Sequence, residues 1–217
     1  MYESSFGRQL MGVVLAISGC AVTFLMLHHP SHFDNGPLTA IVHGGMIVAI
    51  VLAQIGVLYF AIQLGIHQPM VLALAILYSA GSIFNVAAGL INGFIVPEWL
   101  THIGTESHVD SETSELIRDF AWSINQNCAR LGVLVQAAAM LLTVLPLLRF
   151  VRNRTTVALV VVSLVAGLFC PAALWMHQGR LNVHTAMLIY TFEAAWLLMV
   201  GIWLMRPNTA PSISKIT

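Results

Sequence analysis

The sequence predicts an all-α integral membrane protein with six transmembrane helices. Its composition is the first reason: 58% of its 217 residues are hydrophobic and 8% are charged, against roughly 45–50% and about 25% in soluble domains. The second reason is the length of its apolar runs, which are close to the roughly 20 residues that a helix needs to cross a bilayer. No soluble fold of this size can bury so much apolar surface, so lipid must solvate much of the chain.

Composition also limits the kinds of partner and chemistry. Nine basic and nine acidic residues give a net charge of zero, which argues against nucleic acid as a partner because phosphate binding requires concentrated Lys and Arg. Cys20, Cys128 and Cys170 stand alone in separate apolar runs, and we expect them to pack as small core residues. The tetrapeptide ISGC that ends at Cys20 also fits a lipoprotein cleavage site, but the apolar run continues past it, which favours a plain membrane helix.

The apolar runs divide residues 1–206 into six spans with short connections, followed by a polar cytoplasmic tail at 207–217 that we expect to be disordered. Pro97 is expected to end the third span, because proline lacks a backbone donor and biases its neighbour away from helix. One connection, at 98–117, is long and acidic. Within it, the residues from Ser111 look like a helix start, and a helix continuous from there to Leu148 would be about 57 Å long. The expected spans are 9–27, 38–64, 70–96, 118–148, 155–176 and 184–205.

Six spans place both termini on one side of the membrane, and the basic residues indicate which side. Arg118 and Arg180 would lie opposite the termini, Arg130 would lie within the fourth span, and all other basic residues would lie beside the termini. By the positive-inside rule, both termini are expected to be cytoplasmic and the acidic connection extracytoplasmic. We expect a bacterial inner (plasma) membrane. Two sets of three spans would be inverted relative to each other, although no repeat is evident in the sequence. The basic residues assigned to the inside are Arg8, Arg149, Arg152, Arg154, Arg206 and Lys215.

On this topology, every histidine except His67 lies on the extracytoplasmic side. Imidazole is the commonest metal ligand and suits zinc, copper and iron, so one hypothesis is a metal or haem site at that end of the bundle. His43 and His184, which open the second and sixth spans, are the candidates for cofactor binding. The alternative hypothesis is that the histidines cap helices and form hydrogen bonds at the membrane interface. The candidate metal ligands are His28, His32, His43, His177 and His184.

Polar residues inside the spans are expected to face other helices and not lipid. Glu193 of the sixth span is expected to pair with Arg130, because charges inside a membrane usually find each other. A polar cavity is one hypothesis for these groups, and hydrogen bonding between helices is the other. One face of the third span carries Tyr78, Ser82, Asn85, Gly89 and Asn92. The candidate cavity residues are Gln54, Asn85, Asn92, Gln126, Arg130 and Glu193.

Three functions remain open on the sequence. The favoured one is a membrane protein that binds a metal, haem or small ligand, with copper, zinc or haem iron as the candidate cofactors. The second is an accessory subunit of a larger membrane complex, or a homo-oligomer, with no chemistry of its own. The third is a transporter or membrane enzyme with a cavity around Glu193 and Arg130. No Ser/His/Asp or Cys/His arrangement is recognisable by its spacing, so the sequence does not decide whether the chain is an enzyme.

Overall fold

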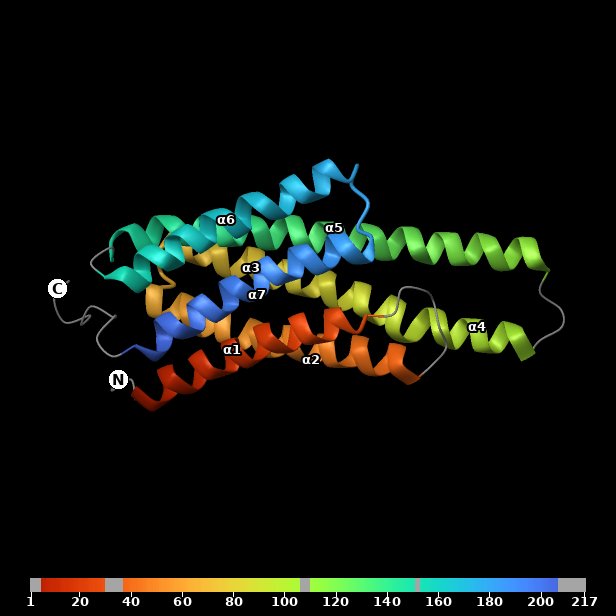
Figure 1. Cartoon of the computed structure of the whole chain (residues 1–217), viewed down its shortest axis with the longest axis horizontal. Helices are drawn as coiled ribbons and strands as arrows, with labels where there is room; N and C mark the ends of the chain where they lie inside the picture. Colours follow the sequence, from red (N-terminus) through yellow and green to blue (C-terminus); the bar gives the residue numbers. More distant parts are fainter. Residues whose placement is uncertain (1–4, 30–36, 106–109, 151–152, 207–217) are drawn as a thin grey trace.

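The computed structural model describes residues 5–29, 37–105, 110–150 and 153–206. In this part of the chain every regular element is helical, and six helices are long and apolar enough to cross a membrane, as predicted. The expected tail at 207–217 lies outside the described residues. The elements are α1 (Ser5–Leu27), α2 (Pro37–Leu64), α3 (Pro69–Leu90), η1 (Ile91–Ile95), α4 (Val96–Thr105), α5 (Ser111–Leu148), α6 (Arg154–Met176) and α7 (Val183–Met205) (Figure 1).

The six long helices form a ring. Each packs mainly against two others in the order α1, α2, α3, α5, α6, α7, and α7 closes the ring on α1. α1 begins and α7 ends at the same end of the bundle (Figure 1), where Arg8 Nη2 donates to the carbonyl oxygen of Arg206 at 3.0 Å. Apolar side chains such as Ile41 (65% exposed) and Ile83 (69% exposed) cover the outside of the ring. The bundle is therefore consistent with a multi-pass membrane protein whose termini share one side.

Glycines bring helix backbones together at two places in this ring. A Cβ atom at Gly201 of α7 would lie 2.5 Å from the carbonyl oxygen of Gly12 of α1, and one at Gly81 of α3 would lie 2.9 Å from the carbonyl oxygen of Gly132 of α5. The same number of positions separates Gly12 from Gly132 as separates Gly81 from Gly201. In packing, α1, α2 and α3 therefore correspond to α5, α6 and α7, which run in the opposite direction. The two halves are therefore inverted in topology and also resemble each other in how their helices pack.

The prediction that Pro97 ends the third span is wrong. α3 passes through the π-helical segment η1 into α4, and a single apolar helix runs over Pro69–His102. The Val96 amide donates to the Ile91 carbonyl, which is the five-residue spacing of a π-helix. The wider turn changes the hydrogen-bond register just before the proline, so the helix continues although the proline donates no bond.

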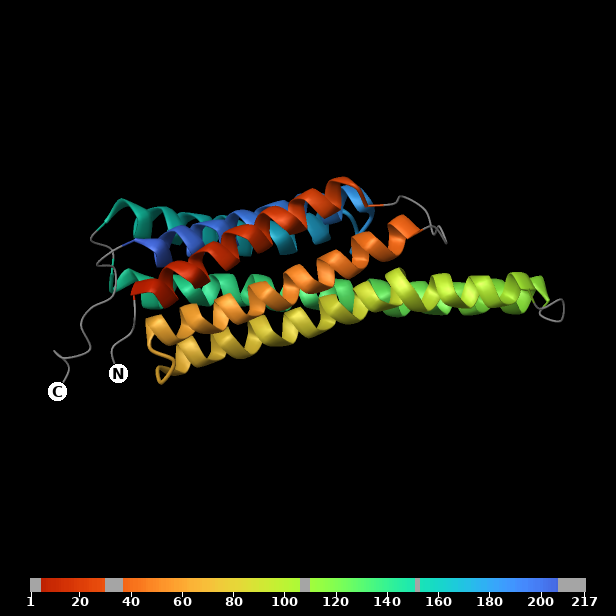
Figure 2. The ribbon, with the colours of Figure 1, turned by 90° about the horizontal axis from the view of Figure 1, so that it is seen from below.

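The connection predicted at 98–117 is also largely helical. α4 occupies its first part, and α5 begins at Ser111 after Asp110, whose carboxylate accepts a hydrogen bond from the Thr113 amide at 2.7 Å. Hydrogen bonds from Thr113 hold the pKa of the Asp110 carboxyl group below its usual value. The resulting α5 has 38 residues, about 57 Å, as expected for one continuous helix. Figure 2 shows that its first turns and α4 project together beyond the other helices.

Aromatic side chains fill the half of the ring that is nearer to the termini. The Phe60 ring lies 5.4 Å from the Trp203 ring and 6.5 Å from the Trp196 ring. The indole nitrogens of both tryptophans donate to hydroxyl groups on α6, at 3.0 Å to Ser163 and 3.2 Å to Thr156. All three rings are at most 1% exposed, so this half of the ring is solid.

Gly201→Ala should lower the free energy of unfolding by about 1–3 kcal/mol, because the new Cβ meets a backbone oxygen that moves only if α1 separates from α7. Gly44→Ala is the matched control, since its Cβ would lie 3.4 Å from the Phe94 ring in ordinary contact and alanine favours helix. Thermal unfolding of both variants in detergent measures the difference. A Gly201→Ala protein as stable as wild type would contradict the close contact.

Candidate ligand-binding cavity

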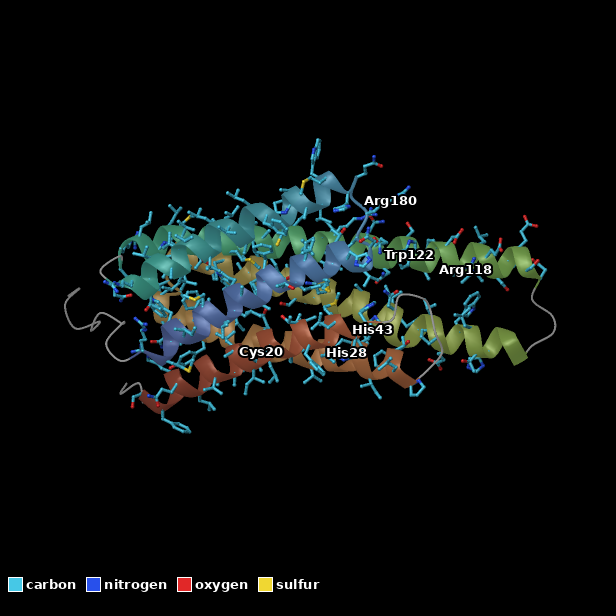
Figure 3. All side chains as sticks on the ribbon, viewed as in Figure 1. Cys20, His28, His43, Arg118, Trp122 and Arg180 are labelled. Atoms are coloured by element: carbon cyan, nitrogen blue, oxygen red, sulfur yellow. The ribbon has the colours of Figure 1, made fainter. Side chains whose placement is uncertain are left out.

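A cavity of about 250 Å³ lies inside the ring at the end away from the termini. Figure 3 shows two residues of its wall, His43 and Trp122, near the level where only α4 and α5 continue beyond the other helices. Trp122 is 43% exposed, so the cavity reaches the molecular surface there. Apolar side chains, among them Met46 and Ile50, complete the wall. The polar and aromatic wall residues are His29, Thr39, His43, Asn85, Asn92, Trp122, Asn125, Gln126 and Tyr190.

Among the described residues, three buried oxygen atoms in this wall have no hydrogen-bond partner: Thr39 Oγ1, Asn92 Oδ1 and Asn125 Oδ1. Thr39 and Asn125 are each 3% exposed. An unsatisfied buried polar group costs about 1–3 kcal/mol, and native structures contain few of them. All three oxygens can accept a hydrogen bond, so together they define a place where a donor is missing.

His43 contributes a fourth acceptor to the same wall. Its Nδ1 lies 2.9 Å from the Thr39 carbonyl oxygen, and because a carbonyl only accepts, Nδ1 must carry the proton. In the neutral ring this leaves Nε2 as an acceptor. The His29 ring packs edge to face on His43 with a centroid distance of 4.8 Å. The imidazole at the start of α2 is therefore fixed in orientation by its own helix and by the end of α1.

The π-helical segment η1 places Asn92 in the same cavity wall as this imidazole. Gly93 lies directly against His43, and a Cβ at Gly93 would stand 2.9 Å from His43 Cγ. Only glycine allows η1 to approach α2 so closely. The change of helical register at η1 thus serves the cavity, because it brings Asn92 into the wall where His43 and Thr39 lie.

A chain of hydrogen bonds from α7 to α2 forms the floor of the cavity. The Tyr190 hydroxyl donates to Asn85 Oδ1 at 3.4 Å, and Asn85 Nδ2 donates to Gln136 Oε1 at 2.6 Å. Gln136 Nε2 lies 3.5 Å from Ser82 Oγ, which lies 3.0 Å from Gln54 Oε1. Of the predicted cavity residues, Asn85 therefore lines the cavity, whereas Gln54 lies beyond its wall and joins α2 to α3.

Gln126 closes the cavity towards the turn that precedes α7. Its Nε2 donates to the Leu181 carbonyl oxygen at 3.3 Å, and its Oε1 accepts from the Leu181 amide at 3.2 Å. Both functional groups of this side chain are satisfied within the protein. Gln126 therefore shapes the wall, while its neighbour Asn125 keeps an oxygen for a ligand.

Glu193 lies just below the floor, three residues after Tyr190 and three before Trp196, and is 7% exposed. It hydrogen-bonds with the Tyr78 hydroxyl. The expected pair between Glu193 and Arg130 is not formed among the described residues. Arg130 instead lines a separate groove between α5 and α6.

The predicted metal ligands that lie in the described part of the chain do not line one cavity. His43 lines the cavity, but His177 and His184 are exposed and lie outside its wall. His28 is exposed, and its Nδ1 lies 2.9 Å from a carbonyl oxygen of its own helix, while His32 lies outside the described residues. In the part of the chain that the structure describes, no three His, Cys, Asp or Glu side chains are placed to hold a metal ion. Geometry therefore gives no support to copper, zinc or haem iron.

Several wall residues are not among the predicted site residues, although the spacing of the chain could have indicated two of them. Thr39 stands one turn before His43 on the same helical face, and Asn125 directly precedes Gln126. No pattern of spacing distinguishes Trp122, which lies near the start of the predicted fourth span. The overlooked wall residues are Thr39, Trp122, Asn125 and Tyr190.

Comparison of the chain with protein-family models, curated proteins and solved structures finds no significant match. The chemistry of the cavity is then the guide to function. Its described wall holds no carboxylate, so a cationic ligand would find no counter-charge. Unsatisfied acceptors beside apolar and aromatic walls suit a small neutral molecule that donates hydrogen bonds.

Thr39→Val should leave the free energy of unfolding of the ligand-free protein unchanged or raise it by up to about 1–3 kcal/mol, because it removes an unsatisfied hydroxyl. Thr143→Val is the matched comparison. Thr143 is 0% exposed and its hydroxyl donates to the Ala139 carbonyl at 3.0 Å, so this variant should lose about 0.5–1.5 kcal/mol. Thermal unfolding in the same detergent compares them, and equal losses would show that Thr39 is already satisfied.

Proposed function

We propose that this chain is an integral membrane protein that binds a small, neutral, donor-rich molecule in the cavity at the end of the bundle away from its termini. The observation that carries the proposal is that Thr39, Asn92 and Asn125 each leave a buried oxygen unsatisfied in one cavity. Proteins accept such a cost mainly where function requires it, because binding then restores the missing bonds.

Each wall residue has a role in this proposal. Asn92 and Asn125 accept hydrogen bonds from ligand hydroxyl or amide N–H groups, and the Thr39 hydroxyl accepts a third. His43 offers Nε2 as a further acceptor, because its Nδ1 is committed to the Thr39 carbonyl. The indole of Trp122, together with the apolar wall, contacts the carbon skeleton of the ligand.

The size of the cavity supports a ligand built on a single ring. An engineered apolar cavity of about 150 Å³ binds benzene, and the cavity here measures about 250 Å³. A benzene ring with two hydroxyl groups is therefore of a size to fit, and its two donors can reach two of the four acceptors. Hydroquinone is the simplest probe of this class, and 1,4-dimethoxybenzene has the same ring without a donor.

We expect hydroquinone to bind the purified protein, and 1,4-dimethoxybenzene to bind at least about tenfold more weakly, because the ether has no proton to donate. Asn125→Leu should weaken hydroquinone binding by about five- to tenfold, the value of one hydrogen bond. Saturation-transfer NMR titrations in detergent measure both differences. Thr143→Val, which changes a buried hydroxyl outside the cavity, serves as the control and should bind as wild type does.

Two results would overturn this proposal. One is equal binding of hydroquinone and its dimethyl ether, which would mean that the acceptors do not select donors. The other is an Asn125→Leu protein that binds hydroquinone as tightly as wild type and Thr143→Val do. Either result would place the probe in the detergent or elsewhere on the protein.

The inverted packing of the two halves favours a second candidate function, transport of the same molecule. In carriers built from inverted repeats, the repeats exchange conformations around a fixed site. Here one end of the ring holds a cavity, and the other is filled by Phe60 and Trp203. Thr155, near the start of α6 as Thr39 is near the start of α2, is 4% exposed with an unsatisfied hydroxyl. An exchange of conformations would open the ring beside Thr155.

Labelling of Thr155→Cys distinguishes a carrier from a fixed binding protein. The variant is made with Cys20 and Cys128 replaced by alanine, and Cys170, which is 1% exposed, is kept as an internal control. A carrier in intact membranes should expose Cys at position 155 to a membrane-impermeant maleimide added on the side of the termini, while Cys170 stays unlabelled. A position 155 thiol as unreactive as Cys170 would exclude alternating access and leave the binding function alone.

A further inference from the structure

A second hollow, a groove of about 740 Å³, lies on the outside of the ring between α5 and α6. Figure 1 shows that α6 diverges from α5 towards the end opposite the termini. Pro171 lies inside α6, and proline can bend a helix because it removes one backbone hydrogen bond and its ring clashes with the preceding turn. The splayed helices leave a space that no other described segment fills. Its wall consists of Arg130, Leu134, Pro171, Leu174, Trp175 and the turn at 178–179.

Arg130 is the only charged side chain among the described residues of this groove, and its Nε is buried without a hydrogen-bond partner. It stands eighteen residues before Leu148, the end of α5, about 27 Å along the helix axis. A bilayer has an apolar core of about 30 Å, so the guanidinium lies at the edge of this core. An arginine at that depth is costly unless it meets an anion or a headgroup.

The other side chains at this groove are also typical of the boundary between acyl chains and headgroups. Trp175 is 83% exposed, and exposed tryptophans are enriched where acyl chains meet headgroups. Arg180 follows the groove directly in sequence and lies at the same end of the bundle (Figure 3). Leu134, Pro171 and Leu174 make the deeper wall apolar. The groove thus combines positive charge at the level of headgroups with an apolar slot at the level of acyl chains.

We propose that this groove binds one anionic glycerophospholipid. Arg130 donates hydrogen bonds from its planar guanidinium to the headgroup phosphate, and an acyl chain lies between α5 and the diverging end of α6. Arg180 adds a second positive charge at the rim, and the described wall contains no carboxylate to oppose it. This site is separate from the cavity inside the ring and does not depend on the function proposed for that cavity.

The test compares lipids that differ only in headgroup. Protein purified in lipid-free detergent is titrated with phosphatidylglycerol or phosphatidylcholine carrying identical acyl chains, and with inorganic phosphate alone. Native mass spectrometry counts retained lipids, and thermal unfolding gives the stabilisation. We expect one phosphatidylglycerol to be retained, with a rise in the melting temperature, and much weaker effects of phosphatidylcholine and of phosphate.

Variants assign the binding to Arg130. Arg130→Gln should reduce phosphatidylglycerol retention about tenfold or more, since a charge-assisted bond is lost, and Arg130→Lys should keep part of it. Arg118→Gln, on the projecting part of α5, removes a charge outside the groove and should retain lipid as wild type does. Trp175→Ala, at an exposed position, should weaken retention without unfolding the bundle, so it provides a second variant if Arg130→Gln does not fold.

Three results would overturn the proposal. The first is equal retention of the two lipids by wild type, and the second is full retention by Arg130→Gln. The third is an equal rise in melting temperature with inorganic phosphate alone, which would indicate a site for free anions. Retention that depends on the headgroup and falls with Arg130→Gln but not with Arg118→Gln would support it.

Discussion

The cavity depends on the close approach of α3 and α5 at Gly81 and Gly132. A Cβ at either position would meet the backbone of the other helix, so only glycine permits this separation. At this distance Asn85 reaches Gln136 across the interface, and Tyr190 of α7 joins them. The corresponding glycine contact between α1 and α7 closes the ring on its other side. With the width of the ring fixed in this way, the size of the side chains inside it decides where space remains.

Side-chain size and polarity differ between the two halves of the ring. Towards the termini, Phe60, Trp196 and Trp203 fill the interior. Towards the other end, the interior positions are taken by smaller polar side chains such as Thr39, and a cavity remains. Several hydroxyl groups elsewhere in the helices donate to a carbonyl of the preceding turn, as Ser163 does at 2.7 Å to Leu159. In a hydrocarbon environment this local satisfaction is the usual solution, so the three unsatisfied oxygens in the cavity call for a ligand.

The sequence was sufficient for the six spans, because bilayer thickness fixes the length of an apolar helix and lipid exposure removes the need for amphipathic patterns. The polar face of the third span was also predictable, since Tyr78, Ser82 and Asn85 recur at helical spacing, and all three are buried. The effect of Pro97 was not predictable. A proline ends most helices, but here the π-helical turn changes the hydrogen-bond register before Pro97, and the helix continues.

The site was harder to predict, because a hydropathy pattern gives the depth of a residue but not its direction around the bundle. His43, His177 and His184 share one end of the bundle, yet His43 alone of the three points into the ring. Arg130 and Glu193 do not form the expected ion pair. Arg130 lines a groove on the outside of the ring, and Glu193 hydrogen-bonds with Tyr78 inside it. Only the three-dimensional arrangement of the helices shows that Asn125 and Thr39 line the same cavity.

The most direct test of the central claim is an experimental density map of the protein extracted with its native lipids and small molecules into nanodiscs. The account predicts one continuous non-protein density in the cavity within hydrogen-bonding distance of Thr39 Oγ1, Asn92 and Asn125, with a matching small molecule in the mass spectrum of the extract. A cavity that contains only separate water peaks, or asparagine side chains turned to bond each other, would contradict it.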